Sequence, residues 1–506
     1  MRKRLPLDRR LELRVSAEDL TAWQQQAASS RSSSVANWIR HILNQEVHSS
    51  LSAHRAADLD RLEAGSDIAT RQVTLPNGLR LVLQEVAGLT HTGVALAVDC
   101  GSRDERRAEF GAANLLGRTL LHSSGSAFAT LEEAGGDANV TTTPDCTLYS
   151  FTAPAHAARS TFERAARILS PSEFSPALLE TEKQSSIRQL DLRRLRAEDL
   201  LADVLTERCW RDHSLGHTPA GEVSALAACT PESLRVFFDR HYGASRMVLS
   251  VWGDFSRWNP EQQAAELFSN LPAGGPSTPF APARFRSFVD VAEWHGRHAN
   301  LAIALAAPPL AAPYRWAFEL WEPLLTQGMY SLLWQKLWSR RSEVLKLSCE
   351  YVAHREAGMF RIHTTSEESA VTWILDRVLT ALEEIVLAPE NLPAGRIHHA
   401  QSVRIARLPK TSDVREQAAN LALTSLLFGE PRHTFEARTA IAATDARLLH
   451  RAFREMLRPQ TGNLSVAIAT PAETNAEQWR KLVQERVRRR STSSEGLSYL
   501  DSPWTM

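Results

Sequence analysis

The sequence has few cysteines and no long apolar run. Its 506 residues include five cysteines, which are scattered along the chain and form no Cys-x-x-Cys pair. An odd, dispersed set of this kind indicates reduced thiols rather than a disulfide framework. No run of 18 apolar residues could cross a membrane, and the basic residues 1–10 lack the apolar core of a signal peptide. The sequence therefore predicts a cytoplasmic protein with no membrane span.

The chain also lacks an excess of charge of either sign. Lys+Arg and Asp+Glu both number 58, while hydrophobic residues make up 43% and charged residues 23% of the sequence. These values are ordinary for globular proteins. A nucleic acid or an acidic partner would therefore have to meet a local patch rather than the field of the whole molecule.

Composition divides the chain into six segments. The two long segments run through strand-like and helix-like stretches in the same general order, and each closes on a buried-strand run, which indicates a duplicated domain. The predicted segments are a compact N-terminal unit (1–48), a polar linker (49–70), a first large domain (71–258), a Pro- and Gly-containing linker (259–284), a second large domain (285–485) and a tail (486–506).

The N-terminal unit alternates strictly over residues 10–15 and then shows two helix-like stretches. Strand, helix and helix over residues 8–47 resemble the ribbon-helix-helix family of DNA-binding dimers. In that family, paired strands from two chains enter the major groove and the second helix begins at a phosphate. The resemblance implies DNA contacts by Arg10, Glu12, Arg14 and Ser34, and a homo-oligomer formed through the strand. A dimerisation module without DNA contact remains the alternative.

The first large segment carries several motifs in a fixed order. A strand pair turns at Pro76-Asn77-Gly78, and a second strand ends at Gly101. A helix-like stretch covers residues 110–121, and a Gly135-Gly136 break is followed by another strand. This order resembles the pitrilysin/insulinase zinc peptidases, which include the mitochondrial processing peptidase and inactive relatives. The resemblance covers about residues 71–485 and implies an α+β fold. Two homologous domains, each an antiparallel sheet with helices, would form a clam shell around a peptide chamber.

Active members of that family carry His-x-x-Glu-His on one helix and a further glutamate ligand on a later helix. The matching positions here hold Asn114, Gly117, Arg118 and Gln189, while the family's outer glutamate is kept as Glu182. Neutral amides are poor zinc ligands, a guanidinium has no lone pair to offer, and glycine supplies no general base. The resemblance therefore implies a degenerate site with no metal, no other cofactor and no catalytic residue. Whether Arg118 pairs with Glu182 is left open.

A second family feature is retained. Ala138, Asn139, Val140 and Thr141 match the edge strand beside which substrates of the family lie. Strand addition uses backbone hydrogen bonds, so peptide binding can persist without zinc. The alternative is that Asn139 only shapes the turn after the two glycines.

These features lead to three functional hypotheses. The first is a non-catalytic partner subunit of an active zinc peptidase of the same family, or a peptide- or protein-binding module. The second is a DNA-binding transcriptional regulator that uses the peptidase-like part as a sensor. The third is an active zinc metalloendopeptidase, against which all four changed positions argue.

Overall fold

A computed structural model describes residues 70–123, 131–168, 174–275, 277, 280–329, 331–387, 392–456, 464–471 and 476–492. Residues 68–506 form one compact unit. The predicted ribbon-helix-helix segment lies outside the described residues, so its dimerisation and its DNA contacts remain predictions. Among the described residues, no helix is long and apolar enough to cross a membrane.

The first half, residues 70–275, is built on a six-stranded mixed sheet with strand order β1-β2-β6-β3-β5-β4. Its strands are β1 (Arg71–Thr74), β2 (Arg80–Glu85), β3 (His91–Val98), β4 (Asp137–Thr142), β5 (Thr147–Pro154) and β6 (Met247–Gly253). Its α-helices are α3 (Ala112–Ser123), α5 (Ala158–Ile168), α6 (Pro176–Arg194), α7 (Ala197–Cys209), α8 (Val223–Ala228), α9 (Pro231–His241) and α10 (Pro260–Phe268). Short 3-10 turns join them: η1 (Ser102–Asp104), η2 (Arg107–Glu109), η3 (Ala155–Ala157), η4 (Ser214–Gly216) and η5 (Ala244–Arg246).

The second half, residues 280–492, is built on a five-stranded sheet with strand order β7-β11-β8-β10-β9. Its strands are β7 (Val289–Trp294), β8 (Ala299–Ala307), β9 (Val344–Ala353), β10 (Gly358–Ser366) and β11 (Leu464–Pro471). Its α-helices are α11 (Arg315–Thr326), α12 (Leu332–Leu337), α13 (Val371–Leu387), α14 (Ala394–Ala406), α15 (Val414–Phe428), α16 (Thr434–Ala442), α17 (Ala446–Met456) and α18 (Ala476–Thr492). The 3-10 turns are η6 (Trp338–Glu343) and η7 (Glu368–Ala370).

The predicted duplication is confirmed by the strand pairing. Strand β6 pairs in parallel with β2 and antiparallel with β3. Strand β11 pairs in the same way with β7 and β8. The late buried run of each half therefore occupies the same place in its sheet, although both sheets are mixed rather than purely antiparallel.

Local sequence explains how the first sheet starts. The Pro-Asn-Gly turn joins β1 to β2, and Gly78 adopts a φ of +92°, which favours glycine. The Asn77 amide donates to the carbonyl oxygens of Phe268 (2.7 Å) and Leu271 (3.2 Å). The turn is thereby tied to the end of α10, far along the chain.

Helix α10 corrects the predicted domain boundary. Residues 259–284 were expected to be a linker, but Asn259 caps α10 and Ala264 and Phe268 enter the core of the first half. The Asn259 side chain accepts from two backbone N–H groups, and Pro260 occupies the first turn, so the helix starts for ordinary capping reasons. The connection between the halves begins only after this helix.

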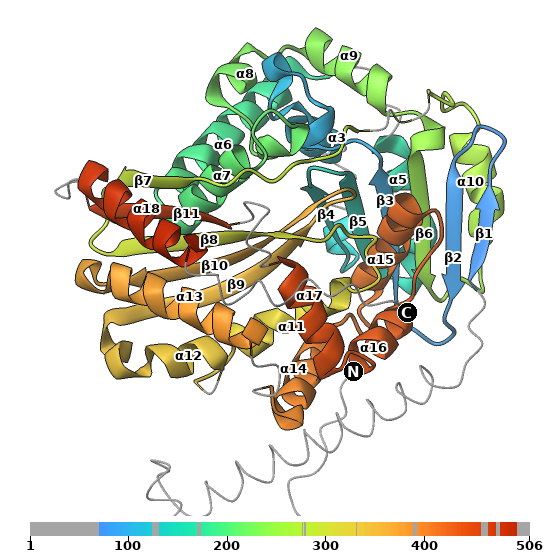
Figure 1. The fold of residues 1–506 in the computed structure, drawn as a ribbon. Coiled ribbons are helices and arrows are strands. Elements are labelled where there is room, and N and C mark those ends of the chain that lie inside the picture. The colour runs from blue at the N-terminus through green and yellow to red at the C-terminus, as the bar shows by residue number, and fades with distance from the viewer. Residues whose placement is uncertain are drawn as a thin grey trace, which may run out of the picture. The chain divides into compact units, whose positions relative to one another are not determined.

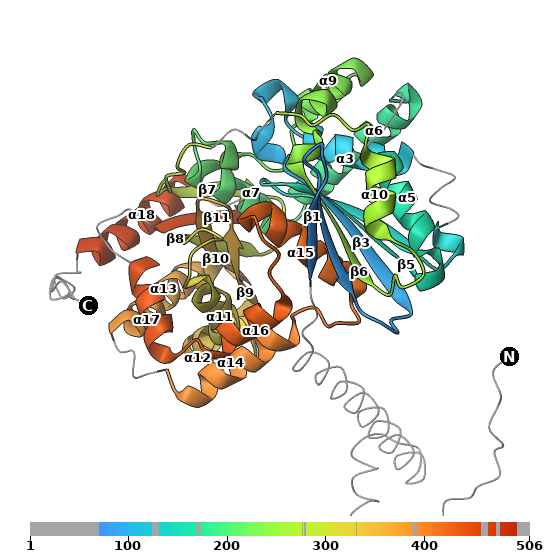
Figure 2. The ribbon, with the colours of Figure 1, turned by 90° about the vertical axis from the view of Figure 1, so that its right-hand side faces the viewer.

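Each sheet is covered on one face by a helix from the other half (Figures 1 and 2). Helix α15 lies on β3 and β6, where its apolar side chains join Val82, Ala95, Ala97 and Val248. Helix α7 lies on β8 and β11, where its apolar side chains join Ala302, Ala304 and Ala467. Within the described residues, each half therefore contributes one helix to the sheet of the other half, and the predicted two-domain α+β architecture is confirmed.

Candidate functional site

Helices α3 and α6 carry the predicted site. The N-terminus of α3 is fixed by the buried Glu105 carboxylate, which accepts from the N–H groups of Gly111 and Ala113 at 2.8 Å each. Helix α6 starts with the Ser175 cap and with proline in its first turn. The two helices pack together, so residues predicted to share one site from distant sequence positions do lie together.

Arg118 links α3 to α6 through three different groups. Its Nε donates to Oε2 of Glu182, its Nη1 to Oε1 of Gln189 and its Nη2 to Oγ of Ser185, each at 2.8 Å. The pairing of Arg118 with Glu182, which the sequence left open, is therefore present. The guanidinium donors lie among the positions that the family resemblance predicts for the metal ligands.

Glu182 is 5% exposed and shares its carboxylate between two partners. While Oε2 accepts from Arg118, Oε1 lies 2.7 Å from Nδ1 of His122. Sequence reasoning missed both His122 and Ser185. The signal for His122 was available, because it follows Arg118 by four residues and so shares its helical face.

Gly117 brings the edge strand close to α3. A Cβ atom at this position would lie 3.1 Å from Cγ2 of Val140 and 3.3 Å from Cγ2 of Thr147. Any larger side chain, including the glutamate of active members, would press on β4 and β5. Asn114, one turn earlier, is half-buried.

The side chains at this site do not fit Zn²⁺. Zinc in proteins takes histidine, cysteine and carboxylate donors, and catalytic sites use three of them. Here the Glu182 carboxylate, which contacts His122 directly, is also paired with the Arg118 guanidinium, which repels a cation and has no lone pair to offer. Among the described residues, no group of three His, Cys, Asp or Glu side chains is arranged to hold a metal ion.

The predicted peptide-binding residues lie on β4, at the end of the six-stranded sheet. Strand β4 pairs antiparallel with β5 along one side and is the outermost strand of the sheet. Ala138 and Val140 pack against the core of the first half, while Asn139 and Thr141 are exposed. The Asn139 amide lies 3.5 Å from Oγ1 of Thr141, a contact too long to fix either side chain firmly. The strand has the geometry of an edge that could accept another strand.

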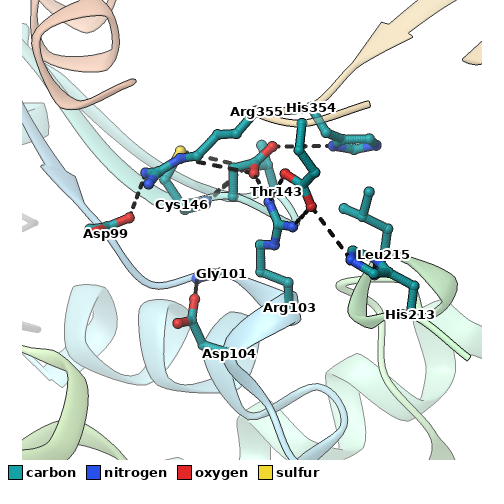
Figure 3. Close-up of polar contacts among 12 residues, drawn as sticks. Asp99, Gly101, Arg103, Asp104, Thr143, Cys146, His213, Leu215, His354 and Arg355 are labelled. Atoms are coloured by element: carbon teal, nitrogen blue, oxygen red, sulfur yellow. Dashed lines mark hydrogen bonds and ion pairs between the residues drawn. The ribbon is translucent and has the colours of Figure 1, made fainter. Parts of the chain in front are cut away.

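Where the turns of two hairpins meet, a buried cluster of charges joins the halves (Figure 3). Arg103 has a fully buried side chain and donates from Nη1 to Asp145 of the β4–β5 turn at 2.5 Å. The same Nη1 donates to Glu356 of the β9–β10 turn at 2.8 Å, and Nη2 contacts the same carboxylate. The guanidinium also lies 3.7 Å from the ring centre of Phe280.

Two further contacts extend this charge cluster. Nδ1 of His354 lies 3.2 Å from Oδ2 of Asp145, and Arg355 donates to Oδ1 of Asp99 at 2.5 Å. Burial alone would raise the pKa of Asp145, but its contacts with His354 and Arg103 lower it below the ordinary value. No local sequence pattern predicts this cluster, because its two parts, Asp99 to Asp145 and His354 to Glu356, are more than 200 residues apart in the sequence.

Comparisons with known proteins agree with this architecture. Residues 80–222 match the family described as insulinase (peptidase family M16), and residues 228–397 match the family described as peptidase M16 inactive domain. The second description concerns the second matched region and not the α3–α6 site.

Curated relatives include an uncharacterized zinc protease of Mycobacterium leprae, 25% identical over 53% of this chain and 62% of the relative. A probable mitochondrial-processing peptidase subunit beta of Arabidopsis thaliana is 26% identical over 40% of this chain and 39% of that protein. The chain thus spans somewhat less than two thirds of the first of these relatives and a smaller part of the second.

Solved structures share the fold. A protease from Helicobacter pylori superposes with a TM-score of 0.71 at 16% identity, over 80% of this chain and 99% of that one. A peptidase M16 inactive domain from Pseudomonas fluorescens gives 0.69 at 16% identity, over 80% and 98%. Since the two family matches together cover more than half of the sequence, this chain carries the paired domains of peptidase family M16 and belongs to that family.

Proposed function

We propose that this chain is a non-catalytic M16 family member that acts as the partner subunit of an active zinc peptidase of the same family. The observation that carries the proposal is the Arg118 guanidinium, which is bonded to Glu182, Ser185 and Gln189, around the positions that the resemblance predicts for the metal ligands. With glycine at position 117, no carboxylate is placed to take a proton from water. The site is well suited to holding α3 against α6 and poorly suited to hydrolysis.

Two further observations support a binding role. The outermost strand β4 offers its free side to an extended peptide. Relatives of this chain include proteins named as beta subunits of the mitochondrial-processing peptidase, so at least some similar proteins work as one subunit of an enzyme.

The partnership is tested by purifying the chain from its native source and identifying the proteins that accompany it. We expect an M16 chain that contains His-x-x-Glu-His. Adding the purified chain to that partner should raise hydrolysis of a fluorogenic peptide, whereas the chain alone should show no hydrolysis that a zinc chelator abolishes. Chelator-sensitive hydrolysis by the chain alone would contradict the proposal.

The peptide-binding part is tested with a labelled extended peptide and a matched peptide that is N-methylated at alternate residues. Strand addition to β4 requires the peptide N–H groups, so methylation should remove binding. Equal binding of both peptides would exclude a backbone-mediated mode at this edge.

A further inference from the structure

A surface patch of the second half is made of tryptophan and arginine side chains from η6 and α13. We call the residues Trp338, Arg340, Arg341, Trp373 and Arg377 the tryptophan–arginine patch. Cζ of Arg341 lies 4.6 Å from the ring centre of Trp338. Cζ of Arg340 and Cζ of Arg377 lie 5.4 and 5.7 Å from the ring centre of Trp373. One indole ring therefore has two guanidinium groups beside it.

The backbone of η6 allows two successive arginines to lie over different rings. The 3-10 turn departs from helical geometry at Arg340, where φ is −125° and ψ is 32°. Trp373 is half-buried and packs against the core of the second half, so the position of its ring is fixed by the fold. Trp338, by contrast, is 47% exposed. The patch thus combines a rigid base with a large apolar side chain that is open to solvent.

Two of the three guanidinium groups of the patch have no carboxylate partner. Arg340 donates to both carboxylate oxygens of Glu343. Within the part of the chain that the structure describes, no carboxylate pairs with Arg341 or Arg377, and both residues are exposed. Asp376, which precedes Arg377, takes part in an interaction of its own. The patch therefore has a local excess of positive charge, although the chain as a whole has equal numbers of basic and acidic residues.

The position of the free arginines prepares them for carboxylates. A guanidinium that lies over an aromatic ring keeps its N–H donors in its own plane, so they stay available at its edge. Carboxylates bind this edge with two parallel hydrogen bonds. Trp338 can meanwhile cover an apolar side chain beside Arg341. Tryptophan and arginine are also among the residue types most enriched at the energetic centres of protein–protein interfaces.

The amount of charge favours a protein segment over a nucleic acid or a lipid surface. Nucleic-acid binding typically uses about six to ten contacts from basic residues to phosphates. Attraction to an anionic membrane takes clusters of about four to eight basic residues. The patch offers two unpaired arginines, and Lys336 of the neighbouring helix α12 is already paired with Glu384. Two guanidinium groups beside an exposed indole ring are complementary to two carboxylates next to an apolar side chain.

We propose that the tryptophan–arginine patch is a docking surface for an acidic segment of a partner protein. The segment places carboxylates on Arg341 and Arg377 and an apolar side chain on Trp338. This surface uses neither the α3–α6 site nor the free side of β4, so the inference goes beyond the proposed function and does not depend on it.

The test is a display library of short random peptides selected on the full chain, followed by calorimetric titration of the most enriched peptide. We expect the enriched peptides to contain more Asp and Glu than the unselected library, next to an aromatic residue or leucine. The same peptide with Asn and Gln in place of Asp and Glu is the control and should not bind.

Two arginine double variants show where the peptide binds. Arg341→Gln with Arg377→Gln should weaken binding by about tenfold or more and make it less sensitive to salt, because both carboxylate contacts are lost. Arg107→Gln with Arg297→Gln removes the same charge from exposed positions elsewhere and should leave binding unchanged. A peptide bound along β4 would not distinguish the two double variants.

Trp338→Ser separates the apolar contact from the charge. We expect binding to weaken by about fivefold with an unchanged dependence on salt, since the ring contributes apolar area to the contact. The proposal is overturned if acidic peptides are not enriched, or if the enriched peptide binds the Arg341 and Arg377 double variant as well as the original chain. It is also overturned if that variant loses binding of oligo(dT) or of anionic lipid vesicles but not of the peptide.

Discussion

The two helices that cross between the halves make different contacts with the sheets they cover. Helix α15 lies on the first sheet, where Val414, Ala418, Leu421, Ala422 and Leu426 pack against apolar residues of the sheet. Backbone contacts reinforce it: Ser250 Oγ donates to the carbonyl of Ala418 at 2.6 Å, and Arg80 donates to that of Ser425 at 2.7 Å. Helix α7 contacts the second sheet through apolar side chains, and charged residues line a cavity at the start of each of the two helices.

The two interfaces differ in how closely the helix backbone approaches the sheet. Gly93 and the alanines of α15 allow the first helix and sheet to approach closely. In the second half, Arg361 and His363 of β10 line a cavity between α7 and the sheet. The first interface therefore depends on close backbone contact, whereas the second depends mainly on apolar side chains.

The largest expected effect on stability comes from disrupting the contact between α15 and the first sheet. A Cβ at Gly93 would lie 2.0 Å from the carbonyl oxygen of Val414, so Gly93→Val must displace the start of α15. We expect the free energy of unfolding to fall by more than about 4 kcal/mol, measured by urea denaturation. Gly275→Ala, where the added Cβ meets nothing within 4 Å, should be neutral. A stable Gly93→Val protein would show that α15 does not depend on this contact.

Removal of the central cation of the charge cluster should have the next largest effect. Arg103→Met leaves Asp145 and Glu356 without their shared partner, and we expect a loss of about 3–4 kcal/mol in the free energy of unfolding. The exposed Arg188→Met on α6 is the matched control and should change stability by less than about 0.5 kcal/mol. Equal stability of the two variants would mean that the cluster does not hold the halves together.

The two crossing helices can be compared directly by truncating one buried leucine in each. Leu421 of α15 is 0% exposed and Leu201 of α7 is 1% exposed. We expect Leu421→Ala to lose about 3 kcal/mol and Leu201→Ala about 2 kcal/mol, because α7 has a cleft beside it and can relax into the space. Thermal or urea unfolding measures both values. The reverse order would contradict the contrast between the interfaces.

The smallest effect concerns pH. Burial lowers the pKa of His241 in the first half to about 4, with a further contribution from Arg240 and Arg246, and burial also lowers that of His363 to about 4. The unfolded chain binds protons on both residues below about pH 6.5, while the folded chain does not. Stability is therefore fully present above pH 6.5 and should fall by about 1–2 kcal/mol per histidine as the pH drops to 4.

Replacement by glutamine distinguishes the contributions of the two histidines to the pH dependence of stability. His241→Gln and His363→Gln should each flatten the fall in stability between pH 6.5 and 4, measured by urea unfolding at each pH. An unchanged pH profile in both variants would show that neither histidine is buried in its neutral form.

The sequence predicted what depends on local pattern. The Pro-Asn-Gly turn and the matching positions of β6 and β11 follow from short motifs and from the family resemblance, whereas the pairing of Arg118 with Glu182 was left open by the sequence.

What the sequence did not reveal depends on distant contacts. The sequence around Arg103 does not show that this residue contacts Glu356, which lies 253 residues later. Likewise, the sequence around His363 does not show that α7 lies over its strand. The linker prediction for residues 259–284 was wrong at α10, because it relied on the proline and glycine residues that follow this helix. The sequence does contain a helix-start signal there, the N-cap residue Asn259.

The most direct test of the degenerate site is the zinc content of the purified chain after incubation with excess zinc and gel filtration. With Arg118 bonded to Glu182, Ser185 and Gln189, the account predicts far less than one zinc atom per chain, and no change in Glu182→Ala. One zinc atom per chain that is lost in Glu182→Ala would contradict it.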